Sequence, residues 1–165
     1  MKKRILSWVL VLCAVLTLLP ATANAAQDGN WYFTVENNEV TITGYVDAPT
    51  GEFTVPSSIR GCPVVAIGEG AFRRCSEITS IIFPESLRSI HELAFYGCAG
   101  ITGELTFPAS LTYIGKMAFV GTSITSVSIP KTLSNMGSYV FKETPVTTAT
   151  YEPCVTTTGD GAFIG

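Results

Sequence analysis

The chain has 165 residues, of which 47% are hydrophobic, and its formal net charge is −3. This length suits one domain with its own core. Three of the 10 basic residues lie in the first four positions, so the chain beyond them is more acidic than the total. An acidic chain lacks the basic face that attracts nucleic acid or an anionic membrane surface, and we therefore expect no nucleic-acid partner.

Residues 1–25 have the composition of a cleavable export signal. A basic start, Lys2-Lys3-Arg4, precedes an uncharged apolar run over 5–19, and Ala23-Asn24-Ala25 supplies small residues before a cleavage point. As a helix, the apolar run would reach about 22 Å, short of the roughly 30 Å hydrocarbon core of a membrane. We predict cleavage after Ala25, a secreted or cell-surface location, and no membrane insertion after cleavage.

Residues 26–50 contain two short alternating segments, Trp31–Val35 and Val40–Thr43. Asn37 and Asn38 lie between them, and asparagine tolerates the positive φ that a two-residue hairpin turn requires. The segments therefore predict a β-hairpin. Because a solenoid must cover the open edge of its first repeat, we expect 26–50 to be an N-terminal cap.

Residues 51–165 carry three markers that recur in phase. The first is an Ala-Phe or Val-Phe pair, whose phenylalanines are 22–24 residues apart: Phe72, Phe95, Phe119, Phe141 and Phe163. The second is an apolar residue followed by proline, as in Phe83-Pro84 and Phe107-Pro108. The third is a Leu or Ile three residues after most of these prolines. Three markers in phase indicate a structural repeat.

Each repeat has the same local pattern. A short alternating segment such as Ile78–Phe83 predicts a strand, and proline ends it because proline has no N–H for a further ladder bond. The Ile-Gly and Ala-Phe positions predict a short helical or 3₁₀ turn. Such a unit buries its apolar face only by stacking in parallel on its neighbours, about 4.8 Å away. The sequence predicts a leucine-rich-repeat-like solenoid of four to five repeats, the last one incomplete.

The repeat resembles a known family. The pattern small-x-x-Ala-Phe, then Cys, then Leu/Ile-x-x-Ile-x-(Ile/Phe)-Pro is similar to the BspA-type leucine-rich repeats of bacterial and protozoan surface proteins, over about residues 50–165. The insertion Ile59–Val65 and the lead-in Trp31–Tyr45 are also similar to that family. The resemblance implies a surface protein that adheres to proteins of a host or a neighbouring cell.

Four cysteines lie beyond the signal: Cys62, Cys75, Cys98 and Cys154. An even number in an exported chain would permit disulfides. Cys75 and Cys98 occupy the same position in adjacent repeats, close enough for a bridge. The alternative, which we predict, is a pair of reduced, buried thiols that fill a small apolar slot. The chain has no CxxC motif or Cys/His cluster, so we expect no metal site.

No constellation of residues predicts catalysis. His91 is the single histidine, and it lies beside Glu92 where other repeats have glycine. We interpret it as a solvated turn residue rather than a general base, because no nucleophile and orienting carboxylate accompany it. We therefore expect no catalytic residue, no cofactor and no enzyme activity. An enzyme would require a catalytic domain in a longer protein of which this is the repeat part.

One strand position predicts a surface. It lies two residues before the proline and points outward, with Thr150 in the corresponding place of the last repeat: Thr54, Ile82, Thr106, Ser128 and Thr150. Stacking turns these residues into a column, and we predict that the column binds a protein or glycan ligand on another cell or on the matrix. In the alternative, Thr and Ser are merely stable on a solvated sheet, and the protein is a structural spacer that associates end to end.

Overall fold

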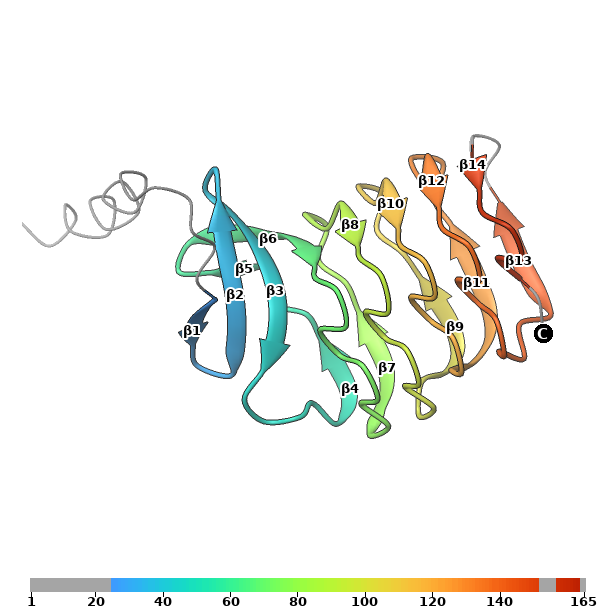
Figure 1. The fold of residues 1–165 in the computed structure, drawn as a ribbon, viewed down its shortest axis with the longest axis horizontal. Helices are drawn as coiled ribbons and strands as arrows, with labels where there is room; N and C mark the ends of the chain where they lie inside the picture. Colours follow the sequence, from blue (N-terminus) through green and yellow to red (C-terminus); the bar gives the residue numbers. More distant parts are fainter. Residues whose placement is uncertain (1–24, 152–156, 164–165) are drawn as a thin grey trace, which may run out of the picture.

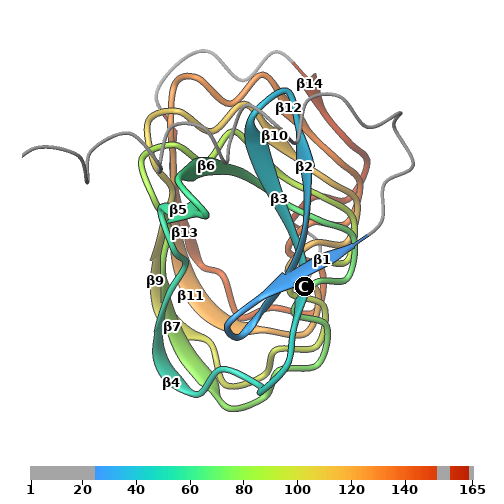
Figure 2. The same cartoon turned by 90° about the vertical axis from the view of Figure 1, so that its left-hand side faces the viewer.

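A computed structural model describes residues 25–151 and 157–163. The predicted signal lies almost wholly outside these residues, as does Cys154. The chain forms a stack of similar coils along its long axis (Figure 1). Seen along the stack, each coil is a closed loop with strands on two of its sides (Figure 2). The predicted repeat solenoid is confirmed.

An antiparallel sheet precedes the first coil. It contains β1 (Ala26–Asp28), β2 (Trp31–Glu36) and β3 (Glu39–Tyr45). The predicted hairpin is β2–β3, and its turn residues Asn37 and Asn38 have φ of 51° and 65°. Positive φ at both central positions is the geometry of the turn that matches strand twist. The sequence analysis did not predict β1.

The hairpin continues into a parallel sheet on one side of the coils, which we call the short-strand face. Strand β3 pairs in parallel with the first of five strands: β6 (Cys62–Ile67), β8 (Ser89–Ile90), β10 (Tyr113–Ile114), β12 (Asn135–Met136) and β14 (Thr157–Thr158). Their register places one apolar residue of each coil on the next: Ile42, Ile67, Ile90, Ile114 and Met136. A short strand β5 (Ser58–Ile59) pairs antiparallel with β6. The cap therefore covers the first coil by extending this sheet.

The opposite side of the coils is the long-strand face. It contains five parallel strands: β4 (Gly51–Thr54), β7 (Ile78–Ile82), β9 (Thr102–Thr106), β11 (Ser123–Ile129) and β13 (Thr148–Tyr151). These strands form two separate sheets, β4–β7 and β9–β11–β13. The five coils thus share one continuous sheet on the short-strand face and a divided one on the long-strand face.

The segments around the Ala-Phe pairs differ in detail from the prediction. They are chains of turns, and no helix or 3₁₀ segment is assigned within 25–151 and 157–163. The Arg73 N–H donates to Gly70 O of its own coil (3.0 Å), whereas the Phe72 N–H donates to Ala94 O of the next coil (2.8 Å). Alternate N–H groups bond to the neighbouring coil, so they are not available for the regular internal bonds that a helix needs.

The core contains a stack of phenylalanine rings. Phe72, Phe95, Phe119, Phe141 and Phe163 stack with centroids 5.2–5.5 Å apart and nearly parallel planes. The first four are at most 1% exposed. This stack runs between the two strand faces and holds the coils in one register.

Candidate binding surface

The five predicted residues lie at equivalent positions of the long-strand face. The register pairs Thr54 with Ile82, and it places Ser128 beside both Thr106 and Thr150. Because side chains alternate along a strand, the five side chains point outward if the residues just before them point inward. Those preceding residues are buried or, for Ala149, half-buried: Phe53, Ile81, Leu105, Val127 and Ala149. We call these five outward residues the column.

A second outward row lies two residues before the column. The ladders place its members side by side within each of the two sheets: Glu52 and Ser80 in one, and Glu104, Ser126 and Thr148 in the other. The sequence analysis missed the two carboxylates of this row. The signal that would have found them is the period of two residues, because the neighbour of an outward residue on the same strand face is two positions away.

The hydroxyl groups of this face serve different purposes. The Thr125 hydroxyl donates to Gly103 O at 3.2 Å, and the Thr150 hydroxyl donates to Val127 O at 3.4 Å, so both join neighbouring coils. In the described part of the chain, no such bond engages the hydroxyls of Thr54, Thr106 or Ser128. Those three side chains remain available to a ligand.

The charged residues on the strands of this face are acidic. None of the strands β4, β7, β9, β11 and β13 contains Lys or Arg, whereas Glu52 and Glu104 are exposed on it. Two of the basic side chains elsewhere have partners: Arg88 forms an ion pair with Glu39, and Arg73 lies over the Tyr96 ring at 5.3 Å. The long-strand face is therefore acidic and hydroxyl-rich.

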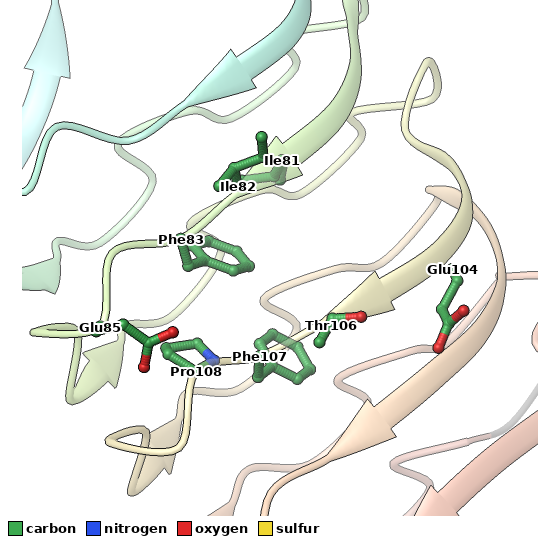
Figure 3. A pocket seen from close by; sticks show the side chains of 8 residues that line it. All are labelled: Ile81, Ile82, Phe83, Glu85, Glu104, Thr106, Phe107 and Pro108. Carbon is green, nitrogen blue, oxygen red and sulfur yellow. The ribbon is translucent and has the colours of Figure 1, made fainter.

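A groove of about 320 Å³ lies where the ladder is interrupted between β7 and β9 (Figure 3). Its apolar lining includes Ile82, Phe83 and Phe107, and the two phenylalanine rings stack at 5.7 Å. The carboxylates of Glu85 and Glu104 also line it. Ile82 is 48% exposed and is the one apolar member of the column.

Unequal segment lengths accompany this interruption. The segment from Cys98 to Pro108 is one residue longer than the segment from Cys75 to Pro84. Gly103, in the longer segment, has φ of 74°, a conformation that glycine adopts without strain. Length alone does not explain the interruption, because the segment from Thr122 to Pro130 is two residues shorter than the segment from Cys98 to Pro108, yet β11 still pairs with β9 across a bulge.

Cys75 and Cys98 lie in the chains of turns around the Ala-Phe pairs, which we call the turn side of the coils, whereas Cys62 begins strand β6. Cys62, Cys75 and Cys98 are buried, and Cys75 and Cys98 are free thiols. The Cys75 Sγ lies 3.0 Å from the Tyr45 hydroxyl, and the Cys98 thiol donates to Phe72 O at 3.0 Å. Burial raises the pKa of Cys98 to about 12. A buried thiol with a raised pKa is a weak nucleophile, so Cys98 acts as a core side chain.

The turn histidine has a simple environment. His91 is exposed, its Nε2 lies 3.3 Å from Ser89 Oγ, and its ring contacts Tyr113 edge to face. Within 25–151 and 157–163, no ion pair with a carboxylate orients the imidazole. A Ser–His pair without that third group lacks the arrangement of an activated nucleophile.

The described residues hold neither a cluster of metal ligands nor a membrane-crossing helix. No three side chains of His, Cys, Asp or Glu come together there as ligands for a metal ion. In the same residues, no helix has the length and apolarity needed to cross a membrane.

Comparison with known proteins gives a consistent fold. A sequence model of the BspA type leucine-rich repeat region matches residues 50–165 in six copies. A leucine-rich cell surface protein from Faecalibacterium prausnitzii A2-165 is 22% identical, with a TM-score of 0.61 over 88% of this chain and 47% of that chain. A leucine-rich repeat protein from Bacteroides ovatus ATCC 8483 is also 22% identical, with a TM-score of 0.51 over 76% of this chain and 40% of that chain. The chain thus spans about half the length of these structures or less. None of the curated proteins matches it.

Proposed function

Because the chain belongs to the BspA-type leucine-rich repeat family, we propose that it is a secreted or cell-surface interaction module. In this proposal it binds a protein or glycan ligand on another cell or on the matrix and catalyses no reaction. The stacked coils support the proposal, because a solenoid offers an extended regular surface to a partner. The description of the F. prausnitzii protein as a cell surface protein supports the location.

The observation that carries the proposal is the column itself. Thr54, Thr106 and Ser128 keep hydroxyls that no bond within the described chain engages, at equivalent positions of three coils. A hydroxyl both donates and accepts, so a row of them offers hydrogen bonds to peptide groups or to sugar hydroxyls. Thr150, whose hydroxyl bonds to Val127 O, would contribute less.

A double substitution tests the proposal. Thr106→Lys with Ser128→Lys should abolish capture of the protein on a panel of immobilised matrix proteins and glycans, because two long cations obstruct the column. The circular dichroism spectrum and Tm should stay nearly unchanged, since both side chains point outward. The matched control is Lys116→Glu with Ser138→Glu on the turn side, which should leave capture intact.

Other outcomes decide against this surface. If the Lys116 and Ser138 changes abolish capture while the column changes do not, the binding surface is on the turn side. If no panel member is captured by the unaltered protein and sedimentation shows concentration-dependent association, the end-to-end spacer replaces the binding module.

A further inference from the structure

The groove between β7 and β9 differs from the rest of the long-strand face. Elsewhere on this face the outward residues lie on paired strands, whereas here the pairing is absent and a volume of about 320 Å³ opens between two coils. The coils do not separate fully, because Phe83 and Phe107 remain stacked and Phe72 stacks on Phe95 at 5.2 Å. The groove is therefore large enough for a side chain of a partner but too narrow for an inserted strand, which would need about 9.6 Å between β7 and β9.

The lining has two kinds of surface in a small space. Ile82 gives most of the exposed apolar wall, with Phe83 and Phe107, 8% and 5% exposed, behind it, and in Figure 3 the carboxylates of Glu85 and Glu104 lie on different sides of it. Neither carboxylate forms an ion pair or hydrogen bond within the described residues. No Lys or Arg lines the groove. An apolar wall with two free carboxylates is complementary to a long apolar stem that ends in a cation.

We propose that this groove receives a lysine or arginine side chain from an extended segment of a partner protein. The aliphatic stem lies against Ile82 and Phe107, and the cationic group reaches Glu85 or Glu104. Thr106, which also lines the groove, offers its hydroxyl to the backbone of the same segment. This inference rests on the proposed binding function and assigns a partner chemistry to one part of the column.

The exposed Ile82 is consistent with this occupant. The other column positions carry Thr or Ser, and Ile82, at 48% exposure, is one of three large exposed hydrophobic side chains in the described residues. An isoleucine side chain in water at this point gains contact area when an aliphatic stem covers it.

Four labelled peptides test the proposal. They share an extended Thr-Val repeat and differ at one central position, which is Lys, Arg, norleucine or Glu, and their binding to the full chain is measured by fluorescence anisotropy. The Lys and Arg peptides should bind about fivefold more tightly than the norleucine peptide at low ionic strength. Salt should remove this advantage, because it screens exposed charges.

Two variants locate the effect. The double change Glu85→Gln with Glu104→Gln should reduce binding of the Lys peptide to that of the norleucine peptide. Glu52→Gln, in the same outward row but outside the groove, should leave it unchanged. Ile82→Thr should lower the binding affinity of the Lys peptide and of the norleucine peptide by the same factor.

The proposal is overturned if the Lys peptide binds no better than the norleucine peptide. It is also overturned if Glu52→Gln weakens binding as much as the groove change does, because the attraction would then be that of a generally acidic face. Either result leaves the proposed function standing as long as Thr106→Lys with Ser128→Lys still abolishes capture on the matrix panel. If Thr106→Lys with Ser128→Lys left capture on the matrix panel intact, the column would not be the binding surface. The peptide measurements would still decide whether the groove binds a cationic side chain.

Discussion

The short-strand face and the long-strand face are built by the same repeats, yet their pairing differs. On the short-strand face, each coil donates one N–H to the coil before it at an equivalent position. His91 N to Ile67 O, Gly115 N to Ile90 O and Gly137 N to Ile114 O all measure 2.7–2.9 Å. On the long-strand face, the ladder has bulges at β4–β7 and β9–β11 and is absent between β7 and β9.

The two faces also differ in how closely the backbones of adjacent coils approach at particular glycines. At Gly137 an added Cβ would lie 2.5 Å from Lys116 N, so the backbones of adjacent coils are in direct contact there. At Gly103, on the long-strand face, an added Cβ would meet nothing within 4 Å. The space at Gly103 is local, because at Gly100, where the chain enters the long-strand face, an added Cβ would lie 2.1 Å from Ser76 O and 2.5 Å from Ile78 O.

The largest expected effect is on the stack of phenylalanine rings between the two faces. Phe95→Ala removes a ring that is 0% exposed and stacks on Phe72 and Phe119. It should lower the free energy of unfolding by about 3–5 kcal/mol, measured by denaturant titration. Phe163→Ala, at a partly buried position, should cost much less. Equal losses would contradict a core that is densest in the central coils.

The next effect is the difference in stability between two glycine substitutions, one on each side of the coils. Gly137→Ala should destabilise the protein by about 3 kcal/mol, because its Cβ would overlap the Lys116 backbone. Gly103→Ala should cost only about 1 kcal/mol, since the new Cβ has space and the cost comes from φ of 74°. Thermal unfolding of both variants makes the comparison. A larger loss at Gly103 would show that backbone strain at positive φ outweighs the overlap at Gly137.

A smaller effect appears at alkaline pH on the turn side. Burial raises the pKa of Cys98 from 9.0 to about 12, so the folded state favours the protonated thiol. Its contribution is complete below pH 9 and is lost as the pH rises toward 12. At pH 10 the loss should be on the order of 1 kcal/mol, measured by denaturant titration at pH 8 and pH 10.

Cys98→Thr is the matched variant for this test. Thr122 occupies the equivalent place one coil later, where it is 3% exposed and donates its hydroxyl to Phe119 O at 3.0 Å. The variant should remain folded at pH 8 and lose less stability between pH 8 and pH 10 than the unaltered protein. The pKa values of Cys75 and Tyr45 are also raised, so part of the alkaline loss should remain. An unchanged loss would remove Cys98 as its source.

The smallest effect is expected at the lip of the groove. Ile82→Thr makes every column residue a hydroxyl residue, and the isoleucine side chain is already 48% exposed. Its effect on stability should stay within about 0.5 kcal/mol, seen as a nearly constant Tm. A marked loss would show that Ile82 supports the core, which would weaken its assignment to a binding surface.

Much of the fold was predictable from the sequence. The markers at Phe72, Phe95, Phe119 and Phe141 recur at nearly constant spacing, and this spacing defines a stack whatever the details of its strands. Asn37-Asn38 predicted the hairpin, because a two-residue turn with positive φ accepts few residue types. The turns around Ala-Phe were predicted less accurately, because each N–H that bonds to the next coil depends on a neighbour that no local pattern contains.

The candidate surface divides in the same way. The sequence by itself determined the repeat, the core phenylalanines and the outward position of Thr54, Ile82, Thr106 and Ser128, because alternation along a strand is a local property. Only the tertiary structure decided that β7 and β9 do not pair and that Glu85 and Glu104 line one groove with Ile82. The physical reason is that pairing between coils depends on how two separate segments lie against each other, which neither segment specifies alone.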